Sequence, residues 1–131
     1  MTQYRFNEAF EPPAPVLPVH VSGVGAQTPA VLLPMLVDTG ADCSLIPVRL
    51  ARTLRLPVVD ELNIVGVGNR AQRVSVHAAR LRIGRMRLLA RVAALGDEAL
   101  LGRDLLNLLV VRLDGPEKLL HLTLVAKPRR R

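Results

Sequence analysis

The sequence predicts an all-β, barrel-like fold, and three observations support that prediction. Short apolar runs alternate with Gly- and Pro-containing turns along most of the 131 residues, which is typical of small sheet-rich barrels. Half of the residues are hydrophobic, yet only 2% are aromatic and there is no Trp, so Leu, Val, Ala and Ile must build the core. A chain of this length is expected to form one domain.

The chain divides into an arm, a domain and a tail. Four prolines between residues 12 and 18 favour extended backbone, so residues 1–16 are expected to form a proline-rich arm with little structure of its own. The folded domain is expected over residues 17–125, and residues 126–131 form a basic tail. The predicted strands cover residues 17–23, 30–37, 43–46, 60–66, 70–83, 86–95, 109–114 and 118–125.

Two short helices are predicted within this framework. The first follows Pro47, which suits a first helical position because it lacks an N–H that the helix would leave unpaired. Its inner face would consist of Val48, Leu50, Ala51 and Leu54. The second follows Gly102 and would run through Leu105, Leu106 and Leu108.

The most informative segment is Val37-Asp38-Thr39-Gly40-Ala41, where an apolar run ends in a carboxylate and a glycine. The run over residues 31–37 predicts a buried strand, and glycine tolerates the backbone angles of a tight turn. A carboxylate at such a strand end is partly desolvated, which makes its proton affinity tunable. The alternative is that Asp38 only caps the turn, as Asp commonly does.

Two further motifs follow, a glycine hairpin at Gly66-Val67-Gly68 and the run Leu100-Leu101-Gly102-Arg103-Asp104. In this order the three motifs resemble the retropepsins, the retroviral-type aspartic proteases. That family carries Asp-Thr/Ser-Gly-Ala, a flap hairpin with glycines at its tip, and two hydrophobic residues followed by Gly-Arg before a short helix. The resemblance covers about residues 17–124 and is similar in layout to the cellular and bacterial single-domain members. It implies a closed retropepsin-like β-barrel that holds one half of an active site per chain.

The resemblance implies a homodimeric aspartic endopeptidase that cuts extended protein or peptide segments. Aspartic proteolysis uses two carboxylates that share one proton, and this chain has a single Asp-Thr-Gly. Asp38 from each chain would form the catalytic pair that activates water, Thr39 would brace the two loops, and Gly40 would hold substrate backbone. No metal or other cofactor is expected. The alternative is a non-catalytic peptide-binding or assembly module that retains the fold.

The resemblance also implies residues that bind substrate or support the site. Ala41 and Asp42 would bind substrate backbone, and Leu100 would line a side-chain pocket. The flap tip would consist of Val65, Gly66, Val67 and Gly68. This flap would close over substrate, unless the segment is an ordinary tight hairpin. Gly102 and Arg103 would support the site, Arg103 by pairing with a partly buried Asp42, unless these two are unrelated surface charges.

Composition bounds the partners and the location. The net charge of +7 suggests nucleic-acid binding, but the Arg residues mostly alternate with apolar residues, as on the solvated face of a strand. The lack of aromatic residues also removes a base-stacking platform, so no nucleic acid is expected. No apolar run reaches the about 18 residues that span a bilayer, and the N-terminus lacks a signal-peptide core. We therefore expect no membrane association and a cytoplasmic location.

The remaining polar residues give weaker signals. Cys43 is the single cysteine, which fits a reducing compartment, and we expect it to be structural. The three histidines are scattered and form no metal-ligand spacing. The apolar run of residues 118–125 is the best candidate for a strand at the dimer interface, with the N-terminal arm as the alternative. No role is assigned to His121 within it.

Overall fold

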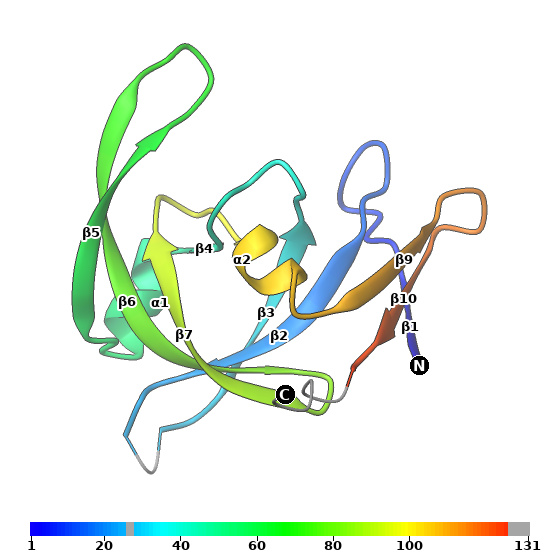
Figure 1. Ribbon diagram of the computed structural model, residues 1–131, viewed down its shortest axis with the longest axis horizontal. Coiled ribbons are helices and arrows are strands. Elements are labelled where there is room, and N and C mark those ends of the chain that lie inside the picture. The colour runs from blue at the N-terminus through cyan, green and yellow to red at the C-terminus, as the bar shows by residue number, and fades with distance from the viewer. Residues whose placement is uncertain (26–27, 126–131) are drawn as a thin grey trace, which may run out of the picture.

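The computed structural model describes residues 1–25 and 28–125, which form a closed β-barrel with a small sheet packed against it (Figure 1). The elements in chain order are β1 (Thr2–Arg5), β2 (Val16–Ser22), β3 (Val31–Val37), β4 (Leu45–Ile46), α1 (Val48–Thr53), β5 (Val58–Val65), β6 (Ala71–Ile83), β7 (Met86–Ala94), β8 (Leu100–Leu101), α2 (Arg103–Leu106), β9 (Val110–Asp114) and β10 (Leu119–Thr123). The predicted tail, residues 126–131, lies outside the described residues.

Six strands close the barrel in the order β2-β3-β8-β4-β7-β6, because β6 pairs with β2 as well as with β7. Neighbouring barrel strands are antiparallel except β3 with β8 and β4 with β7, which are parallel. Strand β5 pairs with β6 and leaves the barrel with it as a long hairpin (Figure 1). The all-β barrel that the sequence predicts is confirmed.

Aliphatic side chains fill the barrel, as the composition requires. On β2, Leu17, Val19 and Val21 alternate toward the interior and are completely buried. Leu81 and Ile83 do the same on β6, the strand paired with β2. The period-2 pattern therefore places apolar side chains inside and leaves the intervening polar ones outside.

The two helices follow Pro47 and Gly102 as predicted but are shorter than predicted. Pro47 is the N-cap of α1 with an extended backbone (φ −61°, ψ 138°), not its first helical residue. The predicted inner face is largely correct, since Leu50, Ala51 and Leu54 are buried. Helix α2 ends at Leu106, so Leu108 lies beyond it and is exposed. Among the helices of the described residues, none is long and apolar enough to cross a membrane.

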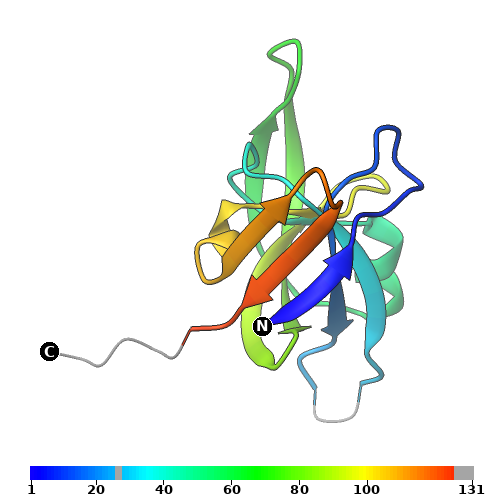
Figure 2. The ribbon, with the colours of Figure 1, turned by 90° about the vertical axis from the view of Figure 1, so that its right-hand side faces the viewer.

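The N-terminal arm contains a strand that the sequence analysis did not predict. Strand β1 pairs with β10, and β10 pairs with β9, to form the three-stranded terminal sheet (Figure 2). Tyr4 and Phe6 pack against the core from this segment, and Asn7 N–H donates to the Ala14 carbonyl at 2.8 Å to close the following loop. Apolar side chains at alternate positions thus order a segment whose prolines suggested a free arm.

Strand β10 is part of the core of its own chain. Leu120 and Leu122 on it are 0% and 2% exposed and belong to the same apolar cluster as the barrel residues. Both backbone edges of β10 are already paired, one with β1 and the other with β9. In the single chain, β10 therefore has no free edge with which to pair across a dimer axis, and which segment forms the dimer interface stays a prediction.

Candidate active site

Asp38 lies immediately after β3, on a turn that two backbone hydrogen bonds and one bond to its own side chain define. Its N–H donates to the Leu101 carbonyl at 3.0 Å, which continues the parallel pairing of β3 with β8. Gly40 N–H donates to Asp38 Oδ1 at 2.9 Å, and Ala41 N–H donates to the Asp38 carbonyl at 3.2 Å. The carboxylate is thereby fixed at the end of a barrel strand, half-buried and within reach of solvent.

A buried serine links this turn to the second half of the site. Ser44 is completely buried; its Oγ accepts from Gly102 N–H at 2.9 Å and donates to Asp104 Oδ1 at 2.7 Å. The other oxygen of Asp104 accepts from Ser44 N–H at 3.1 Å. Asp104 and Ser44 together therefore fasten α2 to the loop that follows Asp38.

Sequence reasoning did not assign a role to either Ser44 or Asp104. A signal existed for Ser44, because it is the polar residue beside an apolar strand that enters the barrel. No local signal identified its partner, since the two residues are 60 positions apart. The predicted strand over residues 43–46 is also shortened to Leu45–Ile46, because the backbone before it serves these contacts.

Gly102 lies where the two halves of the site touch. A Cβ atom added at this residue would lie 2.7 Å from the backbone carbon and oxygen of Cys43 and 3.0 Å from the Ala41 carbonyl oxygen. Arg103 N–H donates to the same Ala41 carbonyl at 2.9 Å. Only glycine permits this approach of two backbones.

The structure brings Arg103 and the Asp38 turn together. Arg103 Nη1 donates to the Thr39 carbonyl at 2.7 Å, and Arg103 Nη2 forms an ion pair with Asp42. The Asp42 side chain is 88% exposed, so the expectation of a partly buried carboxylate is wrong. Exposed ion pairs contribute little to stability. The hydrogen bond from Arg103 to the Thr39 carbonyl adds to the three that define the turn.

Cys43 lies in the same loop, between Asp42 and Ser44, and its thiol is expected to be unreactive. Burial raises the pKa of its thiol above the ordinary 9.0, and the negative charges of Asp104 and Asp42 raise it further. The side chain packs on a small apolar cluster of Leu45, Val74 and Ala93. A thiol that stays protonated at neutral pH is a poor nucleophile, so Cys43 is a packing residue.

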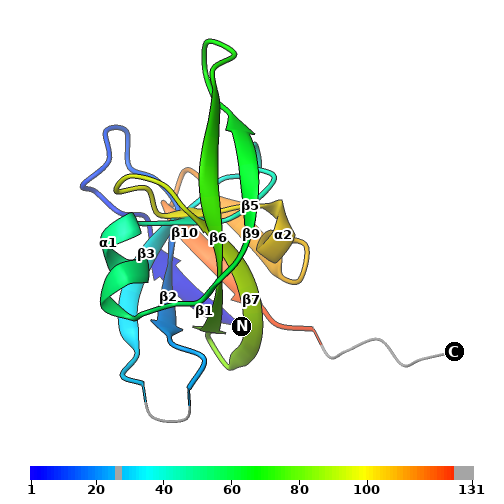
Figure 3. The same ribbon diagram turned by 90° about the vertical axis from the view of Figure 1, so that its left-hand side faces the viewer.

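The glycine hairpin forms the tip of β5 and β6, well away from the barrel (Figures 1 and 3). Gly68 and Asn69 adopt positive φ angles of 88° and 57°, and Val67 at the tip is fully exposed. The tip and the loop after β3 both lie at the upper end of the molecule in these views. Leu100, in β8, pairs with Leu36 and Leu45 and is half-buried.

A family profile described as "gag-polyprotein putative aspartyl protease" matches residues 29–108. That segment is more than half of the chain and contains the Asp38 turn, the glycine hairpin and the Gly102-Arg103 motif. The chain belongs to this family of retropepsin-like aspartic proteases. A comparison with curated protein sequences gave no match.

Solved structures show the same fold for this retropepsin-like chain. A retropepsin-like aspartic protease from Rickettsia conorii has a TM-score of 0.59 at 20% identity and covers 92% of this chain and 88% of its own. The EIAV protease in complex with the inhibitor HBY-793 has a TM-score of 0.55 at 23% identity, covering 72% and 86%. The retroviral protease-like domain of Ddi1 from Leishmania major has a TM-score of 0.52 at 20% identity, covering 83% and 87%. At these identities the likeness establishes the fold, and the predicted retropepsin-like barrel is confirmed.

Proposed function

We propose that this retropepsin-like chain is a homodimeric aspartic endopeptidase in which Asp38 of two chains forms one catalytic pair. One carboxylate would accept a proton from the attacking water while the other, protonated, polarises the scissile carbonyl. Like charges this close cannot both ionise, so the pair holds one shared proton. The substrate would be an extended protein or peptide segment.

The observation that carries this proposal is that the carboxylates near Asp38 already have ion-pair or hydrogen-bond partners. Asp42 pairs with Arg103, and Asp104 accepts hydrogen bonds from Ser44 and from Leu105 N–H. In the described part of the chain, the carboxylate of Asp38 takes a single hydrogen bond, from Gly40. Among the described residues, no other nearby acid is free to complete a dyad, which supports a second carboxylate supplied by another chain.

The remaining roles follow from position. Thr39 and Gly40 are exposed on the turn, where Thr39 would contact the partner's turn and Gly40 would bind substrate backbone. Ala41 and Asp42 would extend that backbone contact, and Leu100 would line a side-chain pocket. The tip residues Val65, Gly66, Val67 and Gly68 would close over the substrate and exclude water. Gly102 and Arg103 would act as structural supports.

The dimer surface is proposed to lie on the side of the Asp38 turn, next to the terminal sheet. Because β10 has no free edge, a partner strand could pair only at β1 or β9, the two outer strands of that sheet. Val110 and Leu113 on β9 are each 49% exposed, which gives this edge apolar surface to cover.

Cleavage assays on matched variants test the catalytic part of the proposal. The purified chain should cleave extended apolar peptides under mildly acidic conditions, and Asp38→Asn should abolish this while leaving peptide binding largely intact. Asp97→Asn makes the same chemical change at an 86% exposed carboxylate and should leave cleavage unchanged. A wild-type chain that binds such peptides without cutting them would instead identify a non-catalytic binding module.

Mixing wild-type and Asp38→Asn chains tests the intermolecular dyad. After subunit exchange, activity per wild-type chain should fall in proportion to the wild-type fraction, and so halve in an equal mixture. Sedimentation on the same samples across a dilution series should show activity that tracks the dimer. Activity that is unaffected by the Asp38→Asn chain, or that persists fully in the monomer, would rule out a shared site.

A further inference from the structure

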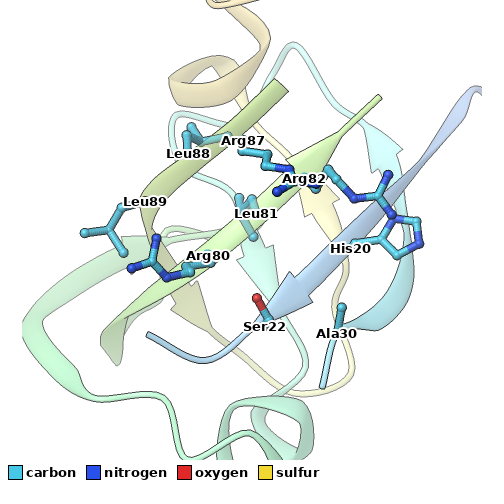
Figure 4. A pocket seen from close by; sticks show the side chains of 9 residues that line it. All are labelled: His20, Ser22, Ala30, Arg80, Leu81, Arg82, Arg87, Leu88 and Leu89. Atoms are coloured by element: carbon cyan, nitrogen blue, oxygen red, sulfur yellow. The ribbon is translucent and has the colours of Figure 1, made fainter. Parts of the chain in front are cut away.

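The outer face of β2, β6 and β7 carries a basic hollow of about 380 Å³ (Figure 4). Arg80 and Arg82 of β6 and Arg87 of β7 line it, together with His20 and Ser22 of β2. These side chains point outward because their neighbours Leu81, Val21 and Leu88 alternate with them along the strands.

Strand register places the cations in two adjacent rows. One row runs from His20 to its β6 partner Arg82 and on to that residue's β7 partner, Arg87. The next row runs from Ser22 to Arg80 and then to Leu89. Two guanidinium groups are therefore directly opposite each other, with a third on the next row. Like charges directly opposite on paired strands destabilise a sheet.

No acidic side chain of the described residues compensates these three arginines. The salt bridges of the described chain involve Arg49, Arg73, Arg91 and Arg103. Arg80 and Arg82 make only long hydrogen bonds of 3.4 Å, to the backbone carbonyls of Val24 and Gly84. The cluster thus keeps a concentrated positive charge over a hollow.

Nearby arginines on the same strands show that this is not a general property of the sheet. Arg91, also on the outer side of β7, pairs with Asp60 at 3.9 Å, and Arg73 on β6 pairs with Glu61. Alternation alone explains why all of them face solvent. It does not explain why the compensated ones lie toward the flap and the uncompensated ones lie together around one hollow.

Exposed apolar residues at the rim of the hollow favour one class of anionic partner over others. Leu89 is 59% exposed at one side, and Leu32, the β3 partner of His20, is 54% exposed at the other. Apolar residues flanking a cationic centre fit a peptide that carries both acidic and apolar side chains, which a free phosphate does not. The described lining contains no Phe, Tyr or Trp on which a nucleobase could stack.

We propose that this face is a docking site for an acidic peptide segment of a partner protein, flanked by apolar residues. It is separate from the Asp38 end of the barrel: Leu32 precedes Asp38 by six positions along β3, or roughly 20 Å at the rise of a strand. The inference does not depend on the proposed proteolysis. A partner protein bound here through one segment would leave the Asp38 end of the barrel uncovered.

Fluorescence anisotropy with a labelled peptide tests the proposal. The probe is a ten-residue peptide with four central Glu residues and Leu at both ends, measured on the full chain carrying Asp38→Asn so that it is not cleaved. Binding should weaken as salt rises, since ionic screening shortens the range of exposed charges. An analogue with Gln in place of Glu should bind at least tenfold more weakly.

Matched charge reversals locate the site. Arg87→Glu should weaken binding at least tenfold, and its fold is protected because the new carboxylate faces Arg82 across the strands. Arg80→Glu, which reverses the charge in the second row, should also weaken peptide binding. Arg112→Glu, an exposed position on β9, makes the same change in net charge and should alter the affinity less than twofold.

Three results would overturn the proposal. Equal losses for Arg87→Glu and Arg112→Glu would mean that net charge alone attracts the peptide. Tighter binding of a 30-nucleotide single-stranded DNA or of phosphatidylserine vesicles than of the peptide would identify a different class of partner. Binding that is insensitive to both Arg80→Glu and Arg87→Glu would place the peptide elsewhere.

Discussion

Gly102 shows how a single missing side chain sets the approach of two loops. Replacing it with Ala would put a Cβ 2.7 Å from the Cys43 backbone, which neither loop can yield easily because both are hydrogen-bonded. Overpacking of this kind costs about 1–3 kcal/mol. Urea unfolding of Gly102→Ala should show that loss, whereas Gly115→Ala, with no atom within 4 Å of the added Cβ, should unfold nearly as the wild type does.

Cys43 makes a pH prediction with a defined sign. Because burial and two carboxylates raise the pKa of the folded thiol above 9.0, the folded chain holds this proton to a higher pH than the unfolded chain does. Cys43 therefore stabilises the fold below about pH 9, and the contribution is lost as the pH rises through the folded pKa. The unfolding free energy of the wild type should fall more steeply above pH 9 than that of Cys43→Ala. Parallel pH profiles would contradict this.

Some residues of the candidate site could be predicted from the sequence and others could not. Asp38, Gly40 and Gly102 could be found because each stands in a short motif whose neighbours follow a known pattern. Ser44 stands out as a polar residue beside an apolar strand, but its role could not be assigned, because that role comes from Asp104 and Gly102, which the fold brings to it from about 60 positions away. A side chain whose role depends on a distant contact leaves little trace in its local sequence.

The predictability of whole elements depended on their length. Strands of five or more residues, such as β2, β3 and β6, carry enough alternation or apolar content to be recognised. Strand β8 has two residues, too few to show a period, yet it pairs with both β3 and β4. Strand β1 was missed because the prolines after it suggested an open arm, while its pairing partner β10 lies at the other end of the sequence.

The terminal sheet makes a prediction about β10. Leu120 is completely buried, whereas its cross-strand partner on β9, Leu113, is 49% exposed. Leu120→Ala should lower the unfolding free energy by about 2–5 kcal/mol, as large-to-small changes in cores do. Leu113→Ala should change it by less than about 0.5 kcal/mol. Urea unfolding at a concentration where sedimentation shows monomer separates the two. A loss for Leu120→Ala that appears only in the dimer would return β10 to the interface.

In the molecule as a whole, one apolar core joins the barrel to the terminal sheet and leaves the far end of the β5–β6 hairpin outside. Leu17 of β2, Ile83 of β6 and Leu120 of β10 belong to the same buried cluster. By contrast, seven of the eight residues of β5 are exposed, and Val67 at the tip has no cover. The chain therefore combines a packed frame that fixes Asp38 with a hairpin whose apolar side chains near the tip, Val65 and Val67, are exposed.

This division predicts a hierarchy of amide hydrogen exchange. Amides of the tip, residues 65–71, should exchange roughly a hundredfold or more faster than those of β2, because local opening there breaks few buried contacts while β2 opens only with the core. If the proposed function is correct, an extended peptide inhibitor should slow exchange at the tip and leave β2 unchanged. Mass spectrometry of peptic fragments measures both. A tip as protected as β2 without ligand would mean that the hairpin is held by contacts the single chain does not provide, and slow exchange that disappears on dilution would identify them as contacts with a second chain.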